Sequence, residues 1–70
     1  MQTVTLVFER EEEGGYSAYV AEIPGVNSQG ESLEEAREMV LEALQELLSY
    51  RREKALALRG AVVEQIAVAI

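Results

Sequence analysis

Apolar residues recur at helical spacing after Ser32, and this pattern restricts the chain to folds built around one amphipathic helix. Residues placed at about 100° intervals gather on one broad stripe. Its members are Leu33, Ala36, Val40, Ala43, Leu44, Leu47 and Leu48. The sequence Ser32-Leu-Glu-Glu35 has the form of a capping box, in which the Ser32 hydroxyl accepts from the Glu35 N–H and the Glu35 carboxylate accepts from the Ser32 N–H. We therefore predict that the helix begins at Leu33.

The end of this helix is marked less sharply. Arg51, Arg52 and Lys54 suit the negative end of a helix dipole. We expect the helix to end near Arg52 to Lys54, followed by an irregular or second helical turn to Gly60. The alternative is a single helix that continues to Arg59, which would be about 40 Å long.

Three segments before the helix have the character of strands. Gln2 to Glu9 alternates between an apolar and a more polar face, and Gly14-Gly15 then favours a hairpin turn. Tyr16 to Ile23 is apolar on both faces, which is typical of a central strand. Pro24-Gly25 ends that strand and leaves a short third strand over Val26 to Gln29.

A fourth strand is expected after the helix. It would begin at Val62 or Val63 and run to the terminus, with Ile66, Val68 and Ile70 on one face. The predicted order is β-β-β-α-β. This places the chain in the α+β class, as a single domain over residues 1–70 with one main helix packed on a small mixed sheet.

Composition excludes several kinds of site. The 70 residues contain no cysteine and no histidine, so disulfides, structural zinc sites of the usual ligands and a Ser-His-Asp triad are ruled out. A domain of this size gains little net stability from its core, which favours self-association into a homo-oligomer. No run approaches the ~18 apolar residues of a membrane span and no leader is recognisable, so we expect no membrane association and a cytoplasmic location.

Charge divides the chain into two parts. Residues 1–46 hold eleven Glu against Arg10 and Arg37, a net charge of −9, whereas residues 47–70 hold four cations against two Glu, a net of +2. Most of this surface would repel a polyanion, so we expect no direct nucleic-acid binding. The cationic cluster has three open interpretations: helix-terminal charges, a seam with the acidic half of a neighbouring subunit, or a minor RNA contact. Its residues are Arg51, Arg52, Lys54 and Arg59.

Four glutamates recur at i, i+4 along the helix and are the candidate partner-binding residues. These are Glu34, Glu38, Glu42 and Glu46, which we call the glutamate ridge. Each adjacent pair costs about 0.2–0.5 kcal/mol, and only Arg37 can relieve it within the helix, although Arg37 falls in the apolar stripe and must snorkel. The ridge is either a solvated face or a surface that receives a basic partner. The same two interpretations apply to Glu9 and Glu11 to Glu13 at the hairpin tip.

The order of these motifs resembles a known family. Gly14-Gly15-Tyr16-Ser-Ala18-Tyr19-Val-Ala-Glu-Ile23-Pro24-Gly25, followed by Gln29-Gly30-Glu31-Ser32-Leu33-Glu34-Glu35-Ala36, closely resembles the signature of the HicB-like antitoxin family. The resemblance covers residues 2 to about 50 well and the last strand loosely. It implies a partial ribonuclease-H-like fold that binds and neutralises a small basic toxin ribonuclease of the HicA type.

The resemblance also indicates what this chain is not expected to do. Longer relatives append a DNA-binding domain, and none is recognisable before Ile70. An active ribonuclease-H-like site needs clustered carboxylates with one in the middle of the first strand, where this sequence has Val4, Leu6 and Phe8. We therefore expect a non-enzymatic protein with no catalytic residues, no metal and no cofactor. A stand-alone structural or regulatory homo-oligomer with no toxin partner is the alternative function.

Overall fold

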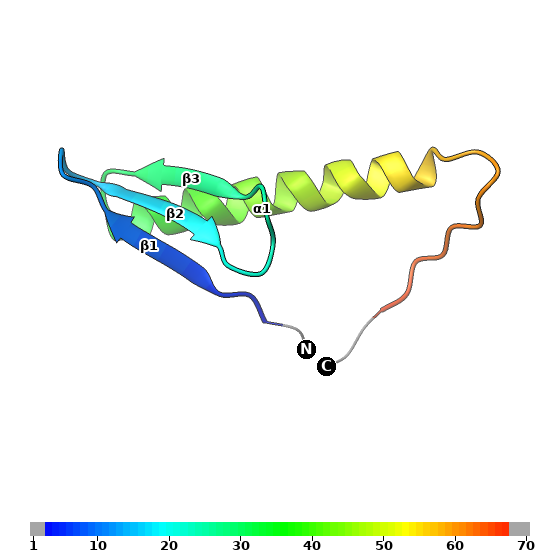
Figure 1. The fold of residues 1–70 in the computed structure, drawn as a ribbon, viewed down its shortest axis with the longest axis horizontal. Coiled ribbons are helices and arrows are strands. Elements are labelled where there is room, and N and C mark those ends of the chain that lie inside the picture. The colour runs from blue at the N-terminus through cyan, green and yellow to red at the C-terminus, as the bar shows by residue number, and fades with distance from the viewer. Residues whose placement is uncertain (1–2, 68–70) are drawn as a thin grey trace.

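The computed structural model describes residues 3–67, which form a three-stranded sheet with one long helix against it (Figure 1). The strands are β1 (Leu6–Arg10), β2 (Tyr16–Val20) and β3 (Asn27–Gly30), and the helix is α1 (Leu33–Leu56). The predicted α+β class is confirmed, as is the order of these four elements.

β2 lies in the centre of the sheet, as its two apolar faces predict, and is antiparallel to both neighbours. The turn between β1 and β2 has φ of 99° at Gly14 and 80° at Gly15, a region that favours glycine. The Glu11 N–H donates to the Gly15 carbonyl at 3.0 Å and closes this turn. Gly14-Gly15 thus sets the hairpin, as the sequence indicates.

The strands are displaced slightly from the predicted ranges. β1 begins at Leu6, so residues 3–5 of the predicted strand lie outside it, and Gln2 lies outside the described residues. β3 runs from Asn27 to Gly30 instead of from Val26 to Gln29. β2 ends at Val20 rather than Ile23 because the chain turns there: the Ile23 N–H donates to the Val20 carbonyl at 3.3 Å. The hydrogen bonds of a turn therefore replace those between strands several residues before Pro24.

The core lies between the sheet and the inner face of α1. Its buried side chains are Ala18, Val20, Val26, Ala36, Val40 and Leu44. The three helical members lie at successive i, i+4 positions in the middle of the predicted stripe. Leu33 and Leu48, also members of that stripe, are both 41% exposed. The sheet therefore covers only part of the apolar face that the sequence provides.

β3 approaches the first turns of α1 so closely that a side chain does not fit between them. A Cβ placed on Gly30 would lie 2.5 Å from the Ala36 nitrogen. Ala36 itself is completely buried. This contact fixes the start of the helix against the end of the sheet.

The helix begins as predicted, with Ser32 as its N-cap. The Ser32 hydroxyl accepts from the Glu35 N–H at 3.1 Å. The reciprocal half of the predicted capping box is wrong, because the Glu35 carboxylate accepts from the Glu31 N–H at 3.0 Å instead of from Ser32. The Glu35 side chain extends one residue further back and secures the segment that joins β3 to α1.

Removing this cap should weaken the fold measurably. We expect Ser32→Ala to lower the free energy of unfolding by about 1 kcal/mol, because the Glu35 N–H loses its side-chain acceptor. Chemical denaturation monitored by circular dichroism measures the change. Ser49→Ala, on an exposed turn in the middle of the helix, is the matched control and should change stability little. Equal losses in both variants would contradict a capping role.

The helix ends later than expected. It continues to Leu56, with Ala57 as C-cap, rather than ending near Arg52 to Lys54. It also stops before Arg59, and Gly60 lies in a later bend with φ of 76°. The helix of 24 residues is about 36 Å long and its last turns project beyond the sheet (Figure 1).

The predicted fourth strand is not formed in the described part of its range. Residues 62–67 lie outside regular structure, and residues 68–70 of the prediction lie outside the described residues. The expected mixed sheet is consequently wrong for residues 3–67, whose three strands pair antiparallel throughout. A strand needs a neighbouring backbone for its hydrogen bonds, and after α1 the chain starts at the end of the helix that projects beyond the sheet (Figure 1).

Candidate partner-binding surface

The glutamate ridge lies on the outer face of α1, away from the sheet. Its four carboxylates belong to exposed residues, whereas the helical positions that pack on the sheet are buried. The i, i+4 spacing brings successive carboxylates to neighbouring positions on consecutive turns. The structure thus confirms that Glu34, Glu38, Glu42 and Glu46 share one accessible surface.

Arg37 does not extend along the ridge. Its guanidinium carbon lies 5.6 Å from the centroid of the Phe8 ring on β1, a cation–π contact with the sheet. Arg37 lies within the apolar stripe, and its side chain brings the charged group out of that stripe by placing it over the Phe8 ring. The cation expected to relieve repulsion beside Glu34 is therefore directed toward β1.

The C-terminal part of the ridge borders a shallow hollow on the helix surface. The hollow is lined by Glu42, Gln45, Glu46, Ser49, Tyr50 and Glu53. The Lys54 ammonium lies 5.5 Å from the centroid of the Tyr50 ring at its margin. Glu53 and Tyr50 were not among the predicted site residues. Their positions seven and four residues after Glu46 are the sequence signal that places them on the same side of the helix.

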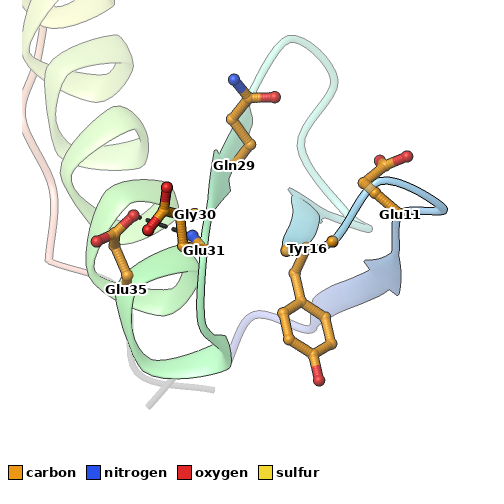
Figure 2. A pocket seen from close by; sticks show the side chains of 8 residues that line it. Glu11, Tyr16, Gln29, Gly30, Glu31 and Glu35 are labelled. Carbon is orange, nitrogen blue, oxygen red and sulfur yellow. Dashed lines mark hydrogen bonds between the residues drawn. The ribbon is translucent and has the colours of Figure 1, made fainter.

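A second hollow, of about 260 Å³, lies between the hairpin and the start of α1 (Figure 2). Glu31 and Glu35 come together beside the helix, whereas Glu11 and Tyr16 lie on the hairpin side (Figure 2). The Tyr16 hydroxyl accepts from Arg10 Nη2 at 3.3 Å, and this hydrogen bond raises the pKa of Arg10. The Glu35 carboxylate is already engaged, because it accepts from the Glu31 N–H.

A carboxylate outside both hollows has a specific structural partner. The Glu22 carboxylate accepts from the Thr5 hydroxyl and from the Thr5 N–H, the latter at 2.7 Å. The hydroxyl bond, followed by the backbone bond, holds the pKa of Glu22 below its usual value. Glu22 thus ties the segment after β2 to the residue before β1.

Each hollow is lined by three glutamates, but in the described part of the chain these carboxylates are not grouped as metal ligands. Within residues 3–67, no three Asp, Glu, His or Cys residues are grouped closely enough to hold a metal ion. Across the same part of the chain, α1 is too polar to form a membrane-spanning helix.

Comparison with known proteins identifies the family of this chain. No family model matches the chain, and no solved structure matches it significantly. A UPF0150 protein of Synechocystis is 40% identical over 50 residues, which are 71% of this chain and 69% of that relative. An identity of this level over more than two thirds of both proteins establishes common membership, and the chain therefore belongs to the UPF0150 family.

Proposed function

We propose that this chain is a HicB-like, antitoxin-type protein that binds a small basic toxin ribonuclease of the HicA type in the cytoplasm and neutralises it by occupation. The observation that carries the proposal is the exposed glutamate ridge. The withdrawal of Arg37 to Phe8 supports it, because that cation does not lie along the ridge. A row of accessible carboxylates attracts a cationic protein and disfavours acidic ones.

The fold is consistent with this proposal. Three antiparallel strands followed by a capped helix match the first four elements of the partial ribonuclease-H-like fold that the HicB-like resemblance implies. The signature residues have structural roles here: Gly14 and Gly15 form the hairpin turn, Gly30 permits the helix contact, and Ser32 caps the helix. These residues support a shared fold. Partner binding is assigned instead to exposed residues, those of the glutamate ridge.

Neutralising two ridge carboxylates should separate partner binding from solubility. We expect Glu42→Gln with Glu46→Gln to slow association with a basic partner and to reduce its salt dependence. The free protein should be equally stable or more stable by a few tenths of a kcal/mol, since like-charge repulsion is relieved. The measurements are association rates at two salt concentrations and thermal melting of the variant alone. Lysine at the same two positions should weaken binding further.

A matched control tests whether the position of the charge matters. Glu12→Gln with Glu13→Gln makes the same change in net charge at the exposed hairpin tip. If association slows only in the control variant, the partner binds at the hairpin tip and not at the ridge. Unchanged association in the ridge variants would show that the ridge is only a solvated face.

A second candidate function is a stand-alone structural or regulatory homo-oligomer. It is favoured by the large apolar side chains that α1 leaves exposed, including Leu41 and Leu48. Purification from the native host distinguishes the two functions. Recovery of a small basic partner supports the antitoxin role, whereas repeated recovery of the chain alone as an oligomer supports the second.

A further inference from the structure

The row of positions that carries the glutamate ridge continues past Glu46 along α1. The next two members at i, i+4 spacing are Tyr50 and Lys54, so the acidic row ends in an aromatic ring and a cation. Tyr50 is 56% exposed, and the last turns of the helix project beyond the sheet (Figure 1). Leu44 is the last residue of α1 that the fold buries. The Tyr50 ring is therefore accessible to another molecule.

No cation of α1 lies at contact spacing from the carboxylates around this ring. The hollow that Tyr50 lines also contains Glu42, Glu46 and Glu53. Helical side chains interact with those three or four residues away, and the sequence places only uncharged or acidic residues at these distances from the three glutamates. In the described part of the chain the carboxylates are too far apart to hold a metal ion. Separate negative charges beside an aromatic ring suit an extended organic cation.

A cation of the chain itself already contacts the ring. The Lys54 ammonium lies 5.5 Å from the centroid of Tyr50. Because helical side chains point back toward the N-terminus, Lys54 reaches the ring from the turn after it, whereas Glu46 lies on the turn before it. The ring thus accepts a positive charge at this position, and an incoming cation competes with Lys54 for it.

A guanidinium is the cation best suited to this competition. It is planar, so it stacks on an aromatic ring and also donates two parallel N–H bonds to one carboxylate. An ammonium is a compact point charge that lacks this geometry. An arginine side chain can therefore use the Tyr50 ring and the Glu46 carboxylate together, which Lys54 does not.

We propose that the basic partner of the glutamate ridge inserts an arginine into this hollow, where its guanidinium stacks on Tyr50 in place of Lys54 and donates to Glu46. The inference rests on the proposed function and adds that recognition depends on arginine and not on positive charge alone. The ridge attracts the partner over a distance, and Tyr50 then holds one of its side chains. Loss of the ring should raise the dissociation rate, whereas loss of ridge charge slows association.

Two short peptides test the preference without the partner itself. Their sequences are identical except that the basic residues are arginine in one and lysine in the other. Titration into the full chain, followed by nuclear magnetic resonance, measures both affinities and locates the binding. We expect the arginine peptide to bind about threefold more tightly, the size of effect that an exposed cation–π contact provides. The largest chemical-shift changes should be at Glu46 and Tyr50.

Variants of the chain assign the preference to the ring. Tyr50→Leu should abolish the difference between the peptides, whereas Tyr50→Phe should retain it. Tyr19→Leu is the matched control, because Tyr19 is 37% exposed on β2 and its loss should leave the preference unchanged. Lys54→Gln removes the internal competitor and should tighten the arginine peptide more than Arg51→Gln, which makes the same change in charge at another exposed position of the helix end.

Equal affinity of the two peptides for the parent chain would overturn the proposal. So would a preference that survives in Tyr50→Leu, or equal tightening by Lys54→Gln and Arg51→Gln. Failure of the antitoxin role gives a different result. If a basic partner binds through the ridge but Tyr50→Leu leaves its dissociation rate unchanged, only the arginine contact is wrong. If the peptides show the preference but no basic partner is recovered from the native host, the hollow selects arginine and the antitoxin role is wrong.

Discussion

Gly30→Ala is expected to unfold most of the protein at ambient temperature. A Cβ at this position would lie 2.5 Å from the Ala36 nitrogen and 2.9 Å from both the Ala36 Cα and the Glu35 carbonyl carbon. All three atoms belong to the backbone of the helix, so no side chain can rotate away. Relief requires α1 to move off β3, which would open the contact around completely buried Ala36.

The expected loss exceeds the usual range for overpacking. Extra atoms in a well-packed core typically cost about 1–3 kcal/mol. Here the obstruction is rigid, and a core of this size supplies only about 3–5 kcal/mol. We therefore expect loss of most of the helical circular dichroism signal, or a denaturation midpoint near zero denaturant.

Gly14→Ala provides the matched control for this experiment. Gly14 has φ of 99°, which strains any residue with a Cβ, but no atom lies within 4 Å of the added carbon. Its cost should be about 1–2 kcal/mol from conformation alone. If Gly30→Ala is no more damaging than Gly14→Ala, the close approach of β3 to α1 is incorrect.

Leu44→Ala is expected to lower the free energy of unfolding by about 2–5 kcal/mol. Leu44 is 8% exposed and is the last buried residue along the helix. The change removes apolar contacts and leaves a cavity between the helix and the sheet. In a domain of 70 residues this is a large share of the total stability.

Urea denaturation measures the free energy of unfolding of Leu44→Ala, and Met39→Ala is the control variant measured in the same way. Met39 is 44% exposed, so its truncation should change stability by only about 0.5 kcal/mol. Similar losses in the two variants would show that the covered face of α1 is not the one centred on Ala36, Val40 and Leu44.

Local signals in the sequence predicted the elements of this fold well. Gly14-Gly15 defined the hairpin, Ser32 defined the start of the helix, and the apolar faces of β2 placed it in the centre of the sheet. The i, i+4 spacing of the glutamates likewise predicted a shared exposed face. Each of these properties depends on residues within one or two turns of each other, so periodicity and capping chemistry suffice.

Other features depend on contacts between distant segments. The sequence suggested a last strand, yet residues 62–67 lack a strand neighbour because α1 continues to Leu56 and carries the chain past the sheet. The cation–π contact between Arg37 and Phe8 joins a helix to a strand 29 positions earlier in the sequence. Periodicity within one element contains no information about such a partner.

The sequence by itself determined that a capped, acidic, amphipathic helix follows three short strands, because these properties arise from neighbouring residues. Only the tertiary structure decided how much of the apolar stripe is covered. It buries Val40 completely and leaves Leu33 and Leu48 exposed, because a three-stranded sheet shields only part of the helix circumference. It also decided that Gly30 is required for a close contact with α1, since that requirement arises from the position of the Ala36 backbone.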